Sequence, residues 1–306
     1  MPHFKEPVVQ PPPLQFGDTV AITAPSSALR DDDSLKRGIA VFKSWGLEVH
    51  RHDLDQRRWG YLAGNDQQRR ADLDQDPTPP LLACARGGWG AARLLEQPWP
   101  WRPGWLLGFS DITSLLCARL AQGVGGGVHG PLVTTLADEP DWSQQRLQEL
   151  LFDQMAPDLC GQPWTEGKAE GPLITVNLTV ASHLLGSCHL PNLKGSILVI
   201  EDVGEAPYRL DRMLTHWRLT GQLQHLAGLG LGRFSGCEDP NGSDSTEHTF
   251  SLEQVLKERT LDLGIPVVSG LPVGHGPGGN AALPMGVHAR LDADRGTLAI
   301  ERPVQR

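Results

Sequence analysis

The sequence predicts an α/β protein: an N-terminal three-layer domain built on a parallel sheet, then a second, C-terminal α/β domain, with a site in the cleft between them. Three observations support this. Short apolar segments alternate with amphipathic ones, a pattern typical of a parallel sheet covered on both faces. The 306 residues suffice for two domains with separate cores. A broken, proline-bearing stretch at residues 153–171 separates two such series.

The domain boundaries follow from these breaks. Residues 1–13 are expected to form a proline-rich N-terminal lead, and residues 14–152 the N-terminal domain. Residues 153–171 show little periodicity and are expected to be a linker. Residues 172–306 then form the C-terminal domain.

The first series of elements begins after the lead. Residues 19–24 predict a buried strand, and a helix follows with Ser34 as its expected N-cap, Gly46 just past its end and one apolar face made of Leu35, Ile39 and Phe42. The next elements are a strand, a polar helix, a strand that ends in a glycine-rich loop, a further strand and a further helix, at residues 47–52, 66–74, 81–85, 105–108 and 111–122.

The second series is expected after the linker. It consists of a helix, a strand, two helices and a strand, at residues 178–185, 196–200, 208–219, 251–263 and 266–268. Residues 287–292 and 297–301 flank Asp294, Arg295 and Gly296, which is a hairpin signal.

Composition limits the classes of function. Hydrophobic residues make up 39% and charged residues 21%, as in globular proteins. The formal charge is -9 and no basic stripe occurs, so nucleic acid is not expected as a partner. No signal peptide or long apolar stretch is visible, so we expect a cytoplasmic protein that does not interact with membranes. The five cysteines are widely spaced, which argues against disulfides and a zinc site; no metal or other cofactor is expected.

Ser110 is the first candidate for chemistry. It stands between an apolar strand that ends at Gly108 and a helix that begins at Asp111. Such a strand-to-helix turn exposes a nucleophile, and the backbone N–H of Asp111 would face an oxyanion. The alternative is that Ser110 only caps the helix. Ile112 stands where the ordinary lipase elbow has glycine, which disfavours that class.

A glycine-rich loop, residues 86–90, could supply a second oxyanion donor. Gly87 and Gly88 lack Cβ atoms, so their backbone N–H groups can approach a ligand closely. A tight turn without a ligand is the plain alternative. The known phosphate-binding glycine motifs do not occur in this loop.

Glu201 and His275 are candidates from the second series. Glu201 lies at the end of an expected strand and could orient an imidazole, or it could pair with Arg209 or Arg212. His275 has glycine on both sides and could reach another domain as a general base, or it could be an ordinary loop residue. His129 is a rival base, which we expect to be structural or to lie on the substrate side.

These segments together resemble the LD-carboxypeptidase family of serine peptidases, which includes the microcin-immunity peptidases. The resemblance runs in order through residues 17–26, 86–90, 108–113, 201–212, 272–276 and 283–286. It implies Ser110 as nucleophile, Glu201 as acid and His275 as base. It also implies oxyanion donors in the Gly87–Gly88 region and at Asp111.

The resemblance implies a reaction and a substrate. A serine carboxypeptidase of this family cleaves the bond between an L-configured centre and a terminal D-amino acid in murein tetrapeptides, through an acyl-enzyme, during peptidoglycan recycling. The expected partner is thus a small peptide substrate; a homodimer is the assembly to consider. One alternative is hydrolysis of an amide in a microcin-like peptide–nucleotide toxin, and another is a non-catalytic protein that binds a small ligand.

Two departures from the family pattern bear on the substrate. Thr175 and Val176 stand where family members carry glycines, and Trp89 replaces a common tyrosine. We expect both changes to add bulk near the cleft. We also expect the triad to be split, with Ser110 in the first domain and Glu201 and His275 in the second.

Overall fold

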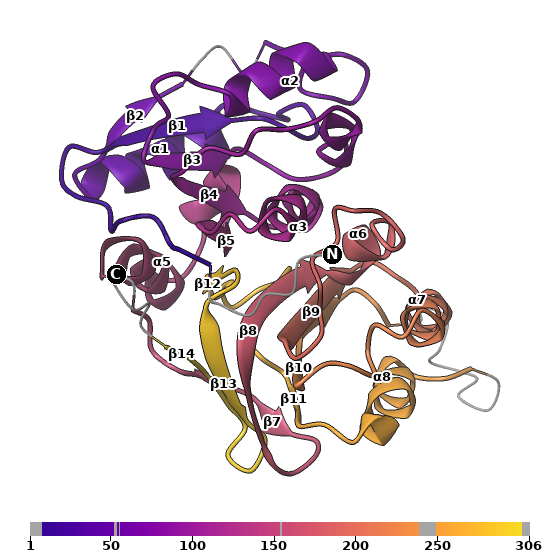
Figure 1. The fold of residues 1–306 in the computed structure, drawn as a ribbon. Coiled ribbons are helices and arrows are strands. Elements are labelled where there is room, and N and C mark those ends of the chain that lie inside the picture. Colours follow the sequence, from indigo (N-terminus) through magenta and orange to yellow (C-terminus); the bar gives the residue numbers. More distant parts are fainter. Residues whose placement is uncertain (1–7, 52–53, 55, 154, 239–248, 302–306) are drawn as a thin grey trace.

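The computed structural model describes residues 8–51, 54, 56–153, 155–238 and 249–301. The chain forms two sheets, each accompanied by helices, as predicted (Figure 1). The α/β fold class is therefore confirmed. Residues 1–7 of the expected lead, and His52 at the end of the expected strand 47–52, lie outside the described residues.

The first sheet has the strand order β12-β5-β4-β3-β1-β2. Strands β1 to β5 are parallel, and β12 pairs with β5 in the antiparallel direction. The bounds are Thr19–Thr23 for β1, Glu48–His50 for β2, Leu81–Cys84 for β3, Trp105–Gly108 for β4, Gly127–His129 for β5 and Leu283–Pro284 for β12.

Helices pack on both faces of this sheet. Apolar residues of α1, α4 and α5 share one core cluster, and residues of α3 and η1 belong to another. The bounds are Asp33–Ser44 for α1, Asp66–Leu73 for α2, Ala92–Glu96 for η1, Ser110–Ile112 for η2, Thr113–Ala121 for α3, Val133–Leu136 for α4 and Asp141–Asp153 for α5.

The second sheet has the order β6-β14-β13-β8-β9-β10-β11-β7. Its four central strands, β8 to β11, are parallel and its edges are antiparallel. The bounds are Leu159–Cys160 for β6, Gln162–Pro163 for β7, Lys168–Asn177 for β8, Ile197–Val203 for β9, Gly228–Ser235 for β10, Val267–Ser269 for β11, His288–Asp292 for β13 and Thr297–Ile300 for β14. Its helices are α6, Leu178–Ser182; α7, Pro207–Leu219; α8, Leu252–Thr260; and η3, Leu261–Leu263.

The elements differ from expectation in a few places. The cap expected at Ser34 is not formed, because α1 begins at Asp33 and Ser34 lies inside the helix; instead the Asp31 side chain accepts a hydrogen bond from the Ser34 backbone N–H at 2.9 Å. The segment 153–171 contains β6, β7 and the start of β8. Strand β10 escaped prediction because it contains three glycines, Gly228, Gly230 and Gly232, and glycine disfavours strands. The fold requires small residues there, since a Cβ on Gly232 would lie 2.6 Å from the Val273 carbonyl oxygen.

The two halves share one continuous core. A single apolar cluster joins Leu115 and Leu116 of α3 to Ile174 of β8 and to Trp217 of α7. Strand β12, although it comes late in the chain, lies beside β5 in the first sheet (Figure 1). The buried Arg146 of α5 donates from Nε to the Ala282 carbonyl oxygen at 3.0 Å, next to β12. We refer to this contact between the halves, from α5 through β12 to β5, as the seam.

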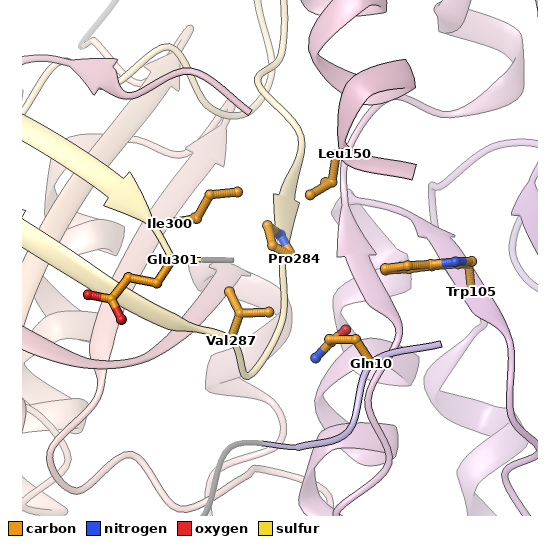
Figure 2. Close-up of a pocket in the computed structure, with 7 residues that line it drawn as sticks. All are labelled: Gln10, Trp105, Leu150, Pro284, Val287, Ile300 and Glu301. Carbon is orange, nitrogen blue, oxygen red and sulfur yellow. The ribbon is translucent and has the colours of Figure 1, made fainter. Parts of the chain in front are cut away.

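A small pocket opens along the seam. Figure 2 shows Trp105 and Leu150 on one side of Pro284, and Val287 and Ile300 on the other. Gln10 and Glu301 complete its lining, and no candidate catalytic residue reaches it. The pocket is thus a gap where the halves pack together and is separate from the candidate site.

Two further findings concern membrane-spanning helices and cysteines. Within the described ranges, no helix combines the length and apolar character needed to cross a membrane. All five cysteines are free, and three of them (Cys84, Cys117 and Cys237) are buried.

Candidate active site

Ser110 lies on a strained turn between β4 and α3. Its φ is +63°, and among the described residues no other non-glycine residue has a positive φ. This left-handed conformation costs a residue with a side chain about 1–2 kcal/mol. The strand before the turn is fully buried, and the Ile112 N–H donates to the Phe109 carbonyl oxygen at 3.2 Å, so the surroundings hold the turn in place. The result is the strand–turn–helix geometry that presents a serine hydroxyl at a sheet edge.

The glycine-rich loop lies against this turn. A Cβ placed on Gly87 would lie 3.0 Å from both Cβ and Oγ of Ser110, and 3.5 Å from the backbone nitrogen of Asp111. Gly88 follows with φ +106° and is exposed. Because Gly87 has no side chain, its backbone can approach Ser110 from the same side as the Asp111 N–H.

The Asp111 side chain joins the loops around the nucleophile. Its Oδ2 accepts hydrogen bonds from Ser26 Oγ at 2.6 Å and from the Ala91 N–H at 2.8 Å. The carboxyl group is fully buried, and this burial raises its pKa. Asp111 thus connects the turn after β4 to the loops that follow β1 and β3.

Glu201 and His275 form a direct pair. His275 Nδ1 lies 2.7 Å from Glu201 Oε2, and the His275 backbone N–H donates to the same oxygen at 3.1 Å. Glu201, on β9, is fully buried, whereas the His275 side chain is 22% exposed. The carboxylate thereby sets both the position and the tautomer of the ring, and leaves Nε2 directed away from Glu201.

A polar network supports the buried carboxylate. Asn177 Nδ2 donates to Glu201 Oε1 at 3.1 Å and lies 3.2 Å from Asp202 Oδ1. Asp202 in turn accepts from the backbone and the hydroxyl of Thr179 at 2.9 and 2.8 Å, and burial raises its pKa. Arg209 pairs with Glu205, and among the described residues neither Arg209 nor Arg212 pairs with Glu201, so the alternative of an ion pair with either arginine is not realised.

The loop that carries His275 depends on Gly274. Gly274 has φ +102°, and a Cβ there would lie 2.5 Å from Glu201 Oε2. Asn280 Oδ1 accepts from the Gly274 N–H at 2.8 Å, and Ser235 Oγ donates to the His275 carbonyl oxygen at 2.6 Å. The ring is therefore held by backbone and side-chain contacts on both sides.

Phe109 brings the two halves of the site together. Its ring centroid lies 4.6 Å from that of His275, so the histidine of the second half packs against the residue that precedes Ser110. Phe109 also contacts His129, with centroids 5.7 Å apart. Phe109 thus links the turn that carries Ser110 to the Glu201–His275 pair of the second half.

His129 has a different environment. It is fully buried, and among the described residues neither ring nitrogen has a hydrogen-bond partner. Burial lowers its pKa to about 4. Buried in this way, His129 is neutral at physiological pH, and Glu201 pairs with His275 and not with His129.

The departures from the family pattern lie in different places. Thr175 and Val176 are fully buried in β8, so neither presents an exposed side chain at the surface. Trp89 is 43% exposed, next to Gly88. Sequence reasoning also missed Asn177, Ser26 and Phe109, whose roles depend on contacts across the fold; only the helix-capping position of Asn177 gave a local signal.

Comparison with known proteins places the chain in a family. The model of the LD-carboxypeptidase N-terminal domain matches residues 20–130, and that of the LD-carboxypeptidase C-terminal domain matches residues 170–291. A relative from Synechocystis sp. is 49% identical over 95% of this chain and 97% of its own. The murein tetrapeptide carboxypeptidase of Pseudomonas aeruginosa is 34% identical over 90% of this chain and 94% of its own.

Solved structures agree on the fold. The muramoyltetrapeptide carboxypeptidase from Oxalobacter formigenes has a TM-score of 0.80 and 28% identity, and covers 94% of this chain and 100% of its own. The microcin C7 self immunity protein MccF, in its wild-type apo state, has a TM-score of 0.82 and covers 97% of this chain and 100% of its own. Its identity of 20% shows a shared fold alone.

Proposed function

The chain belongs to the LD-carboxypeptidase family of peptidases, and from this premise we propose that it cleaves murein tetrapeptides by a Ser110–Glu201–His275 triad. The bond cleaved joins an L-configured centre to the terminal D-amino acid. The observation that carries the proposal is the Glu201–His275 pair at 2.7 Å, packed through Phe109 against the strained turn of Ser110.

The first half of the reaction forms an acyl-enzyme. Glu201 holds Nδ1 of His275, so Nε2 is the nitrogen that accepts the Ser110 proton as Oγ attacks the carbonyl carbon. The oxyanion that results is stabilised by backbone N–H groups of the Gly87–Gly88 segment and of Asp111. His275 then gives the proton to the leaving amine, and the terminal D-amino acid departs.

The second half releases the shortened peptide. Water attacks the ester carbonyl while His275 accepts its proton, and Ser110 is regenerated when His275 returns that proton to Oγ. Glu201 keeps its contact with Nδ1 and stabilises the imidazolium in both halves. Its buried position strengthens this charge interaction, because little water screens it.

The proposal extends to the organisation of the chain. We keep residues 14–152 as the domain of the nucleophile and residues 172–306 as the domain of Glu201 and His275, with residues 153–171 between them. The site is then assembled only when the halves pack together. Cytoplasmic recycling of wall peptides is the role that this substrate suggests.

Mass analysis of products tests the proposal. Incubation of the protein with murein tetrapeptide should yield the tripeptide and the free terminal D-amino acid. Ser110→Ala should lower kcat by about 10⁴ to 10⁶-fold, because loss of a triad member removes the covalent route. A circular dichroism spectrum equal to the wild type would show that the variant is folded. Retention of more than about a tenth of the rate would remove Ser110 from this role.

A further inference from the structure

Three arginines near the nucleophile have no acidic partner among the residues that the structure describes. Arg86 is half-buried and donates from Nη1 to the Ala28 carbonyl oxygen at 2.6 Å. Arg58 is exposed and donates from Nη2 to the next carbonyl, that of Leu29, at 3.2 Å. Arg30 follows directly and is exposed. Within the described part of the chain, none of the three forms an ion pair with a carboxylate.

Several other arginines of the region do have acidic partners, although Arg70 donates to carbonyl oxygens. The neighbouring arginines Arg51, Arg57, Arg69 and Arg93 all pair with aspartates. The acidic residues that follow Arg30 are engaged elsewhere: Asp31 with the Ser34 N–H, Asp32 with Lys36 and Arg51, and Asp33 with Lys36. In a chain of net charge -9, three like charges that have no counter-ion among the described residues indicate an anion that comes from outside.

The loops that carry the arginines are tied to the site. Ser27 Oγ accepts from the Trp89 N–H at 3.0 Å, and the Ala28 N–H donates to the Tyr61 carbonyl oxygen at 2.9 Å. An Arg86 Nη2 atom lies 3.5 Å from where a Cβ on the exposed Gly88 would be. Burial, and then the charges of Arg30 and Arg58, lower the pKa of Arg86. The three guanidinium groups therefore share one surface beside the glycine-rich loop.

The sheet order indicates which part of a substrate would reach them. Arg86 follows β3, next to β4 with Ser110, and Arg30 follows β1, one strand further. With strands about 4.8 Å apart, these loops begin roughly 5 and 10 Å from the nucleophile along the sheet edge. An extended peptide covers about 3.4 Å per residue, so these distances correspond to about one and a half and about three residues. A single leaving residue is too short to cover them.

We propose that Arg30, Arg58 and Arg86 form a subsite for the free carboxylates of the substrate that lie upstream of the cleaved bond. This inference rests on the proposed function, because it assigns the acyl side of the peptide to this surface. The planar guanidinium groups bind carboxylates through paired hydrogen bonds. The exposed ring of Trp89 borders the same surface and offers an apolar contact to the peptide.

Binding of the product tests this subsite without any turnover. Calorimetry would compare the murein tripeptide with its internal carboxylates free against the same peptide with them converted to carboxamides. We expect the wild type to bind the free form about tenfold more tightly, and Arg30→Gln/Arg58→Gln to bind the two forms almost equally. Arg37→Gln/Arg290→Gln removes the same two charges at exposed sites elsewhere and should keep the preference.

Kinetics give a second readout. In the Arg30→Gln/Arg58→Gln variant, KM for the tetrapeptide should rise about tenfold while kcat changes little, since neither residue touches the reacting atoms. Equal binding of both peptides by the wild type, or binding of neither, would overturn the subsite. So would loss of the preference in the control variant. Failure of the proposed function is read separately, as the absence of tetrapeptide cleavage by the wild type.

Discussion

At the scale of single residues, Glu201 and His275 differ in burial and in the hydrogen bonds that they form. Glu201 accepts three hydrogen bonds, from Asn177 Nδ2 and from the ring and backbone of His275, and has no exposed surface. His275 uses one ring nitrogen for that contact and keeps part of its ring in solvent. The acid is therefore suited to orienting and the histidine to proton transfer.

This division predicts unequal costs of substitution. Glu201→Gln can still accept from His275 but cannot stabilise the imidazolium, so kcat should fall by about 10⁴-fold. His275→Ala removes the base itself and should cost about 10⁶-fold. The measurement is kcat of each variant on murein tetrapeptide. If His129→Ala proved as damaging as His275→Ala in a folded protein, the base would be wrongly assigned.

His129 predicts a pH effect on stability. Its pKa is about 4 in the folded protein and near 6.5 when unfolded, so the unfolded state binds the proton first as pH falls. The contribution of neutral, buried His129 to the free energy of unfolding is fully present above pH 6.5 and is lost as the pH falls towards 4. The loss amounts to at most about 3 kcal/mol. Urea unfolding at pH 7.5, 6 and 5 should show that the free energy of unfolding falls less with decreasing pH in His129→Leu than in the wild type. An identical pH profile in both proteins would contradict this account.

At the scale of elements, the loop between β11 and β12 sets the histidine in place. Gly274 and Gly270 both have positive φ, +102° and +69°, so alanine strains the backbone at either position. Only at Gly274 would the new Cβ also strike a neighbour, the Glu201 carboxylate. Alanine substitutions at the two positions thus distinguish the effect of backbone strain alone from the effect of displacing the catalytic pair.

We expect Gly274→Ala to lower kcat by at least about 100-fold, because it displaces Glu201 from His275. Gly270→Ala meets no atom within 4 Å and should lower stability by about 1 kcal/mol while kcat stays within about threefold. Activity and denaturant unfolding of both variants check this. Comparable kcat values in the two variants would show that the loop tolerates the displacement.

At the scale of the whole molecule, the seam joins the two parts of the site. Arg146 is buried and donates to the carbonyl oxygens of Ala282 and Pro157, and burial lowers its pKa to about 10. Ala282 leads directly into β12, which pairs with β5 of the first sheet. The relative placement of Ser110 and His275 therefore depends on contacts that include neither residue.

Arg146→Gln should weaken the seam. Loss of bonds to buried carbonyl groups should cost about 2–4 kcal/mol of stability and lower kcat, although no catalytic side chain changes. Arg290→Gln, which removes an exposed ion pair with Glu170, is the matched control and should cost less than about 1 kcal/mol. Urea unfolding and kcat give the answer; equal effects in both variants would show that Arg146 does not hold the halves together.

Local signals in the sequence were enough for much of the fold. Apolar runs predicted β1, β3, β4, β9 and β11, and helical periodicity predicted α1, α7 and α8. The strands are visible as continuous apolar runs because both faces of the sheet are covered, and the helices because their apolar residues repeat with the helical period. The turn at Ser110 was also readable, since a strand and a helix meet there with no room for a loop.

Other features were decided only by tertiary structure. Strand β10 forms although it contains three glycines. The packing around it requires glycine, because the neighbouring residues leave no space for side chains at Gly230 and Gly232. Two-residue β12 has no periodicity to read and exists only because β5 offers an open edge. Asn177 contacts Glu201, which is 24 positions away in the sequence, and Phe109 contacts His275, which is 166 positions away. The sequence by itself therefore determined most elements and identified the candidate reactive residues. Packing between distant segments decided which of these residues come into contact, because contact energies depend on distance in space and not on separation along the chain.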